Sequence, residues 1–318
     1  MSILKLHLGD DLHGFDARVF AAHRADIHLC DAEGRARCSL WWREVPAYQN
    51  ERLGVIGHFE SRDFETGLAV LREAVAVLKE RGCTLAVGPM DGNTWRRYRA
   101  VTFRGTEPPF FMEPDTPDDW PRLFESAGFQ TLATYCSDIA TDLEKRDPRA
   151  LRATERFVSA GVIFRDLNPA AFEEDLRRIY RVSRVSFVHN FLYMEISEDE
   201  FVQQYLPYRD KIDPRLVLIA EQGGEVVGFL FGIPDVAEAM RGEPIRTVIG
   251  KTLAILPQRQ FGGLGVVLVD LLHQRACELG YKRVIHALQN EANPVCNISR
   301  ITGTLMRKYA LYCTPIEK

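Results

Sequence analysis

The residues best suited to chemistry are three glycines between an aliphatic segment and a helical pattern. Thr252–Leu256 is rich in aliphatic residues and ends at Pro257, and Gly262, Gly263 and Gly265 follow within one turn. Apolar residues then recur at helical spacing. A glycine-rich loop that opens a helix presents backbone N–H groups at the positive end of the helix dipole, and glycine lets a bulky anion come close. The segment therefore predicts a binding site for a diphosphate.

The order of features around this loop resembles the acetyl-CoA signature of the GCN5-related N-acetyltransferase (GNAT) superfamily. In that family the loop reads Q/R-x-x-G-x-G/A, and Gln260, Gly263 and Gly265 match it in register. A P-loop would need Gly-Lys-Ser/Thr at its end, whereas Gly265 is followed by Val266-Val267. A dinucleotide fingerprint would need G-x-G-x-x-G and an acidic residue ending the next strand, which here ends in Gln289-Asn290. The resemblance therefore implies coenzyme A.

The resemblance also implies which residues hold the cofactor. In the family, backbone N–H groups of the strand before the loop contact the acetyl carbonyl and the pantetheine, and those of the loop hold the diphosphate. The corresponding residues here are Leu253, Ala254, Ile255, Arg259, Gln260, Phe261, Gly262, Gly263, Leu264, Gly265, Val266 and Asn293. An ordinary buried strand, a solvated Arg259 and a helix N-cap at Asn293 are the alternatives to these roles.

The residues that carry out catalysis are less well defined. The family usually has a tyrosine, four residues before a glycine, that protonates the departing sulfur, and Ser299 stands at that spacing before Gly303. A serine hydroxyl can hydrogen-bond the sulfur but is a poor acid, so Tyr309 on the last predicted strand is the alternative acid. Arg246–Leu256 contains no carboxylate to serve as base. His286 is the candidate base, with a core histidine as the alternative, and some family members deprotonate the amine through water.

The acceptor site is expected after the first helix of the second half. In the family that segment forms the acceptor wall, and Phe187–Glu195 mixes aromatic and polar side chains, which suits a partly apolar pocket. Hydrophobic packing explains the aromatic residues equally well. Trp95 and the basic cluster at 96–99 could contribute from the first half, although such a cluster is more typical of a solvated surface. The candidate substrate-binding residues are His189, Asn190 and Tyr193.

The chain repeats one order of elements. The fold class that this implies is α/β, with two tandem GNAT-like domains, each a mixed, mostly antiparallel central sheet flanked by helices. We expect a degenerate GNAT-like domain at 1–140, a linker at 141–154 and an acetyl-CoA-binding GNAT domain at 155–318. Where the second half has QRQFGGLG, the first has SRDFETG, whose one glycine and two carboxylates would repel a diphosphate.

The predicted elements follow from hydrophobic periodicity and turn residues. In the first half they are strands at Ile27–Cys30, Arg37–Trp42, Arg52–Ser61 and Leu85–Gly88, and helices at Phe15–His23, Thr66–Arg81 and Trp120–Ala127. In the second half they are strands at Gly161–Asn168, Arg215–Glu221, Glu225–Ile233, Arg246–Leu256, Arg283–Leu288 and Met306–Cys313, and helices at Pro169–His189, Glu198–Tyr208, Gly265–Leu279 and Asn293–Thr302, the last with Pro294 at its first position.

The composition suits a soluble globular protein. The 318 residues are 46% hydrophobic and 26% charged, with a net charge of −4. The absence of a Lys/Arg block argues against nucleic acid and membrane as partners, and no apolar stretch approaches the ~18 residues of a membrane span. Seven scattered cysteines without C-x-x-C indicate a reducing cytoplasm and no metal site.

Taken together, the sequence predicts an acetyl-CoA-dependent N-acetyltransferase. A bound primary amine, either a small molecule or a peptide N-terminus, would attack the thioester directly. Two alternatives stay open: an acyl-CoA-binding sensor or structural protein without catalysis, and a transferase of a longer acyl group. A homodimer is possible, but nothing in the sequence decides the oligomeric state.

Overall fold

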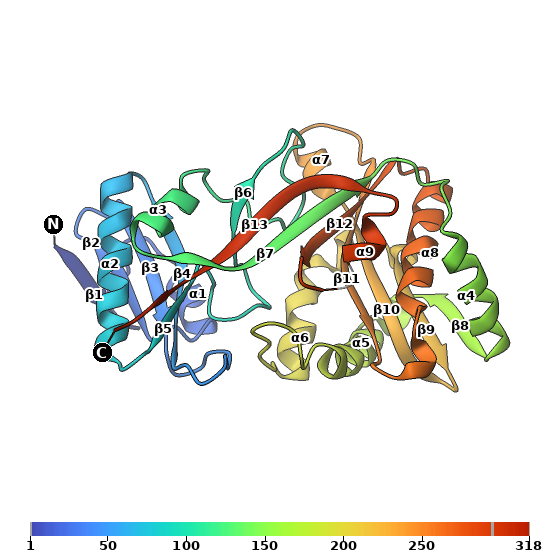
Figure 1. Ribbon diagram of the computed structural model, residues 1–318, viewed down its shortest axis with the longest axis horizontal. Coiled ribbons are helices and arrows are strands. Elements are labelled where there is room, and N and C mark those ends of the chain that lie inside the picture. The colour runs from blue at the N-terminus through green and yellow to red at the C-terminus, as the bar shows by residue number, and fades with distance from the viewer. Residues whose placement is uncertain (1, 294–295, 318) are drawn as a thin grey trace.

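The strands of the protein form one sheet that crosses the whole molecule (Figure 1). The computed structural model describes residues 2–293 and 296–317. Within them the strand order is β1-β2-β3-β4-β5-β13-β7-β12-β11-β10-β9-β8, with β6 pairing β13 off this path. The strands are β1 (Ile3–Leu6), β2 (Ile27–Asp31), β3 (Ala36–Trp41), β4 (Leu53–Ser61), β5 (Leu85–Gly88), β6 (Ala100–Phe103), β7 (Gln130–Ala140), β8 (Val162–Asp166), β9 (Val217–Gln222), β10 (Glu225–Pro234), β11 (Thr247–Ile255), β12 (Arg283–Asn290) and β13 (Thr304–Pro315).

Helices cover both faces of this sheet. The α-helices are α1 (Ala17–Ala22), α2 (Phe64–Glu80), α3 (Trp120–Ser126), α4 (Pro148–Ser159), α5 (Phe172–Ser186), α6 (Glu198–Tyr205), α7 (Val236–Met240), α8 (Leu264–Glu278) and α9 (Cys296–Ser299). Short 3₁₀ turns are η1 (Pro169–Ala171), η2 (Leu206–Lys211), η3 (Pro214–Leu216) and η4 (Arg259–Phe261). The predicted α/β class, a mixed and mostly antiparallel sheet flanked by helices, is confirmed. The predicted Pro294 lies outside the described residues.

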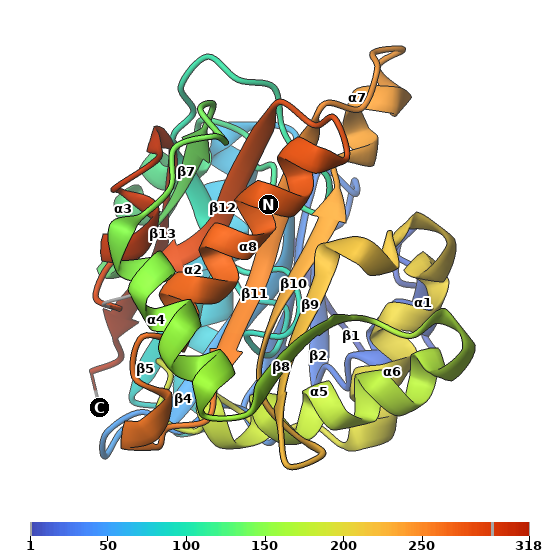
Figure 2. The same ribbon diagram turned by 90° about the vertical axis from the view of Figure 1, so that its right-hand side faces the viewer.

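Part of the segment expected to be a linker is a helix. Helix α4 begins at Pro148, inside residues 141–154, and the side chain of its N-cap Asp147 accepts a hydrogen bond from the N–H of Arg149 at 2.8 Å. Proline suits the first helical position because the N–H there has no partner within the helix. Phe157 is buried, and Figure 2 shows α4 alongside α8. The same proline that suggests a linker in the sequence therefore starts a packed helix.

The two halves of the chain exchange their last strands. We call residues 2–140 the N-terminal half and the described residues from 141 onward the C-terminal half. Strand β7 of the N-terminal half pairs with β12 of the C-terminal half, and β13 pairs with β5 of the N-terminal half. The two exchanged strands also pair with each other over most of their length, from Thr304 opposite Ile139 to Cys313 opposite Gln130. Figure 1 shows them crossing the middle of the molecule side by side. Hydrogen bonds therefore join the halves without a break.

Each half contains two parallel strands that diverge. Strands β11 and β12 pair from Thr247 opposite Arg283 to Gly250 opposite His286, and β11 then continues without β12. Strands β4 and β5 pair only up to Val55 opposite Val87. We call the two openings the C-terminal splay and the N-terminal splay.

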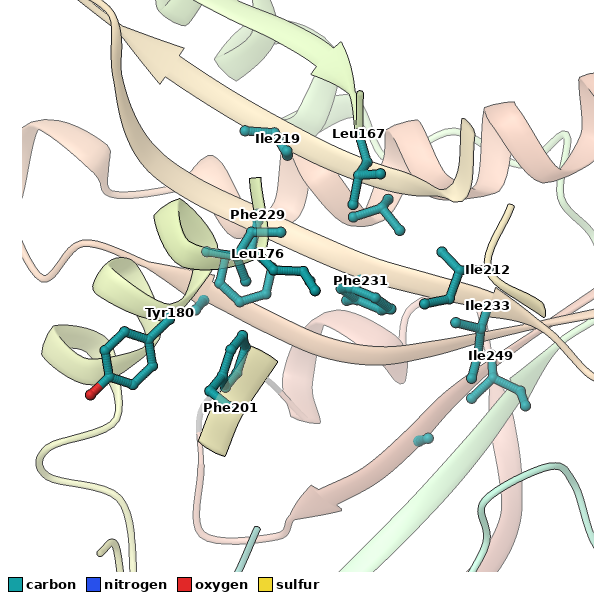
Figure 3. Packing of buried hydrophobic residues seen from close by; sticks show 14 of the residues in the cluster. Leu167, Leu176, Tyr180, Phe201, Ile212, Ile219, Phe229, Phe231, Ile233 and Ile249 are labelled. Carbon is teal, nitrogen blue, oxygen red and sulfur yellow. The ribbon is translucent and has the colours of Figure 1, made fainter. Parts of the chain in front are cut away.

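The C-terminal half is built around strand β10. One face of this strand packs against α5 and α6, where Leu176, Tyr180 and Phe201 meet Phe229 and Phe231 (Figure 3). The Tyr180 hydroxyl donates to the Ile196 carbonyl at 2.7 Å, so this buried polar group is satisfied. Burial of each such side chain contributes about 1.5–3 kcal/mol. The opposite face packs against α8, so β10 is held between two layers of helices.

Candidate functional site

The C-terminal splay opens into a cavity between the two halves. This main cavity has a volume of about 1160 Å³ and is lined by β11, β12, the segment after α5 and residues 94–99 of the N-terminal half. A side cavity of about 500 Å³ adjoins it, and both share Trp95, Tyr205 and Lys251. A volume of this size suits a bound organic molecule.

Strand β11 presents its unpaired edge to the main cavity. Leu253, Ala254 and Ile255 all line the cavity, as their predicted role requires. A β-bulge inserts Lys251 as an extra residue, because Phe231 opposes Thr252 while Gly232 opposes Gly250. Bulges redirect the backbone and side chain of the extra residue. Ser186 of α5 donates to the carbonyl of Ile255 at 2.8 Å and so fixes the far end of this strand.

The glycine loop leaves the start of α8 uncapped. Gly263 is the N-cap residue, with φ of 91°, and no side chain caps the helix. The first N–H groups of a helix have no partner within it, so those that begin α8 can bind an anion. The N–H groups of Phe261 and Gly262 already donate to the carbonyls of Gln258 and Arg259. An anion would therefore meet Gly263, Leu264, Gly265 and Val266.

The side chains around the loop divide into structural and exposed groups. Phe261 and Leu264 are buried in the core, whereas Arg259 and Gln260 are exposed. Arg156 of α4 donates to the carbonyl of Gly262 and brings a second positive charge to the loop. The sequence did not indicate this arginine, because helix α4, which carries it, was not predicted. Asn293 is exposed and lines the main cavity.

The predicted catalytic residues lie in different surroundings. His286 lines the main cavity, and its Nε2 lies 3.0 Å from Nε2 of His273. Burial, with a smaller effect of His273, lowers the pKa of His286 to about 3, so this side chain is neutral near pH 7. Ser299 also lines the cavity, but its hydroxyl donates to Asp138 Oδ2 at 2.7 Å. Neither group is a strong acid or base in this arrangement.

Tyr309 is fully buried and is not among the residues that line the main cavity. Its hydroxyl donates to Glu113, which also accepts from Arg307 at 2.7 Å. Burial and the neighbouring Glu113 raise the pKa of Tyr309 above its ordinary value. The structure thus places this predicted acid in the seam between β13 and β7, away from the splay.

The predicted acceptor residues are brought together. His189, Asn190 and Tyr193 line the main cavity on the segment after α5. The Tyr193 hydroxyl is buried and has no hydrogen-bond partner among the described residues, which makes it available to a ligand. The ring of Trp95 packs near that of Tyr193, with 6.1 Å between the ring centroids. The side chains that suggested a pocket in the sequence therefore face one.

A hairpin of the N-terminal half forms the opposite wall. Its arms are joined by hydrogen bonds from Arg99 N to Pro89 O at 2.8 Å and from Asp91 N to Arg97 O at 2.9 Å. Asp91 lines the side cavity, and Tyr98 and Arg99 line the main cavity. Burial raises the pKa of Asp91 to about 6. No pattern in the sequence singled out Asp91, since a lone acidic residue before Gly92 is typical of a turn.

Two classes of site are not found in the part of the chain that the structure describes. No group of three or more metal-ligating side chains is present there. No helix among residues 2–293 and 296–317 is long and apolar enough to cross a membrane.

Comparison with known proteins finds similarity in sequence and in fold. No family model matches the chain. It is 28% identical over 191 residues to the bacterial ceramide synthase of Caulobacter vibrioides, an alignment that covers 58% of this chain and 49% of that protein. The chain therefore spans about half the length of this relative.

Solved structures show the same fold at low identity. A GCN5-related glucosamine N-acetyltransferase region of a fungal multi-domain β-N-acetylglucosaminidase superposes with a TM-score of 0.56 at 14% identity, covering 98% of this chain and 38% of that one. A tandem GNAT protein from the clavulanic acid biosynthesis pathway gives a TM-score of 0.51 at 11% identity, covering 100% and 99%. The chain has the GNAT fold in tandem form.

Proposed function

We propose that this protein is an N-acyltransferase that takes its acyl group from acyl-coenzyme A. The observation that carries the proposal is the uncapped N-terminus of α8, which lies at the end of a splay that opens into the main cavity. A diphosphate on the N–H groups of Gly263–Val266, with Arg156 beside it, directs the pantetheine along the free edge of β11. Acyl transfer is the chemistry that the fold supports.

Binding and orientation are the main tasks of the residues around the thioester. The amine nitrogen attacks the thioester carbonyl, the carbon–sulfur bond breaks, and the thiolate leaves and takes up a proton. Backbone N–H groups at the Lys251 bulge and the Lys251 ammonium are donors for the developing oxyanion. We assign the base that receives the ammonium proton to Asp91, directly or through water, because a carboxylate with a pKa of about 6 is ionised at neutral pH. Tyr309, His286 and Ser299 then hold the surrounding structure.

The length of the acyl group and the identity of the acceptor amine are further parts of this proposal. Acetyl transfer to a small amine or a peptide N-terminus is the simplest form of the activity. A longer acyl group is favoured by one observation, the side cavity beside Lys251, whose wall includes Phe231, Ile233 and Ile212. Ceramide is an amide of a fatty acid with a long-chain amine, so the ceramide synthase relative supports the same alternative. A cytoplasmic location and a homodimer also remain predictions.

Calorimetric binding of acetyl-CoA and of palmitoyl-CoA tests the proposal. We expect one site per chain, and the Gly263→Asp variant should bind acyl-CoA at least ~100-fold more weakly, because a carboxylate at that position caps the helix and repels the diphosphate. Gly280→Asp is the matched control at the other end of α8, since Gly280 has φ of 87° and open space around it. Absence of acyl-CoA binding by the wild type, or equal affinity of the two variants, would contradict the proposal.

Release of CoA thiol separates catalysis from a sensor role. Wild-type protein with acyl-CoA and a panel of primary amines should release thiol in proportion to amide formed. Tight acyl-CoA binding without thiol release by any amine would favour the non-catalytic alternative.

A further inference from the structure

Arg99 carries a buried positive charge beside the main cavity. Only 4% of its surface is exposed, although it lines that cavity. Its guanidinium lies in the corner formed by two aromatic rings that stand at 86° to each other, 3.7 Å from the centroid of Tyr98 and 4.0 Å from that of Tyr135. Cation–π contacts with two rings at right angles restrict the positions that this group can take.

The hydrogen bonds of Arg99 are incomplete. One Nη donates to the carbonyl of Leu288 at 2.9 Å, and Nε is buried without a partner. Among the described residues, no carboxylate lies within 4.0 Å of this guanidinium. A buried polar group without a partner is costly, and a buried charge without a counter-charge is more so. Something that the protein binds can supply the missing acceptor.

Two carboxylates on the walls of the two cavities, Glu113 of the main cavity and Glu200 of the side cavity, are already engaged by other arginines. Glu113 accepts from Arg307 at 2.7 Å, and Glu200 pairs with Arg96 at 3.3 Å. Lys251 adds a further cation to the cavity wall, with its ammonium 5.2 Å from the centroid of the Tyr205 ring. The main cavity therefore offers positive charge that Glu113, the acidic side chain among its described lining residues, does not neutralise.

The backbone around Arg99 is strained in a way that fixes this position. Arg99 has φ of 75° and its acceptor Leu288 has φ of 57°, both in the left-handed region that favours glycine. Leu288 lies within a register shift in β12, between His286 and Gln289, and its N–H donates to the Ser137 hydroxyl at 3.0 Å. Strained residues of this kind cluster at binding sites, where surrounding structure holds them. Here the strain places Arg99 against the end of β12, at the mouth of the C-terminal splay.

We propose that Arg99 binds an oxyanion, a carboxylate or a phosphate group, on the amine that accepts the acyl group. The inference rests on the proposed function and specifies the substrate class of the same site: an amine that also bears an acidic group, as in an amino acid or an aminoalkyl phosphate. A planar guanidinium matches both oxyanions with two parallel hydrogen bonds. The same hairpin supplies Asp91, so one element recognises the acid and the amine of a single molecule.

Matched pairs of probes test this inference by calorimetry on CoA-bound protein. Leucine is compared with leucinamide, and phosphoethanolamine with ethanolamine, so each pair differs in the acidic group. We expect the wild type to bind one of the two acids at least ~10-fold more tightly than its neutral partner, which also identifies the oxyanion. In the Arg99→Met variant this preference should fall to about 1, and Arg99→Lys should retain part of it.

The measured quantity is the ratio of the two affinities, acidic probe over neutral probe, within one variant. A variant that simply loses structure weakens both affinities and leaves this ratio unchanged. Arg97→Met is the control, because Arg97 also lines the main cavity but is exposed and stacks over Trp120. This variant should keep the wild-type ratio. The inference is wrong if the wild type shows no preference for either acid, or if Arg99→Met weakens acid and neutral probe equally. Failure of the wild type to bind acyl-CoA would instead count against the proposed function.

Discussion

Helices α2 and α8 begin at equivalent places in the two halves, yet their N-termini differ. The carboxylate of Asp63 caps α2, accepting from the N–H of Thr66 at 2.8 Å and from its hydroxyl at 2.9 Å. Helix α8 begins at Gly263, which has no side chain to offer. A helix end that binds its own carboxylate has no room for a phosphate, so only α8 keeps an open anion site.

The two splays differ as the two helix N-termini do: the N-terminal splay is filled by the chain itself, and the C-terminal splay is open. Each half has a β-bulge directly after a glycine, at Gly57-His58 in β4 and at Gly250-Lys251 in β11. In the N-terminal splay the chain itself returns, with Met90 N donating to Ile56 O at 2.8 Å and His58 N donating to Asp91 Oδ1 at 2.6 Å. In the C-terminal splay the corresponding space belongs to the main cavity. One copy of the fold thus leaves its splay open to a cavity, and the other fills its own splay with the inserted hairpin, which also forms a wall of that cavity.

The largest expected effect tests how tightly the N-terminal splay is filled. A Cβ on Gly57 would lie 2.1 Å from the carbonyl oxygen of Met90, a backbone atom, so Gly57→Ala should lower the free energy of unfolding by about 3 kcal/mol. A Cβ on Gly250 would meet the movable Leu272 side chain at 3.2 Å, and Gly250→Ala should cost clearly less. Urea denaturation measures both. Equal losses would mean that the two splays are filled alike.

A smaller effect is expected when Asp91 is changed to Asn. If this carboxylate is the base, kcat should fall about 10–100-fold while acyl-CoA affinity stays the same. Because burial raises the pKa of Asp91 to about 6, the ionised base is lost as the pH falls through 6, and wild-type kcat should fall with it. The variant should lack this acidic limb.

Asp91→Asn should lower kcat but raise the stability of the fold. A carboxyl whose pKa is raised in the folded state opposes folding above its unfolded pKa, so removing its charge should raise the melting temperature near neutral pH. Lower stability together with lower kcat would indicate that Asp91 only supports the hairpin through its bond to the His58 N–H.

The smallest effect concerns the cap of α2. Asp63→Ala should lower the free energy of unfolding by about 1 kcal/mol, as loss of an N-cap usually does. It should not create a second acyl-CoA site, because Met90 and Asp91 still occupy the N-terminal splay. Calorimetric stoichiometry measures this directly, and two sites per chain would show that the carboxylate alone had closed the slot.

The sequence predicted local features well and long-range ones poorly. The strand, glycine loop and helix around Gly263 could be predicted because each depends on neighbouring residues. Strand β7 was not predicted, since its partners β12 and β13 lie far along the chain. The basic cluster at 96–99 resembled a solvated surface, and only the tertiary structure shows that Arg99 is buried against two aromatic rings.

The candidate site also contains residues that the sequence could indicate and residues that it could not. Leu253–Ile255, His189, Asn190 and Tyr193 line the main cavity, and a resemblance in motif order was enough to indicate them. Their predicted roles still await the binding experiments. Asp91 and Arg156 reach the site by the folding of distant segments, and no spacing in the sequence marks them.

The exchange of β7 and β13 has a consequence for how the protein is made. Strand β5 has β13 as its neighbour, so the sheet of the N-terminal half stays incomplete until residues 304–315 have left the ribosome. An unpaired sheet edge is prone to association with other chains, and pairings between distant segments form slowly. The nascent N-terminal half should therefore depend on chaperones until residues 304–315 have emerged, and the two halves should fold as one cooperative unit.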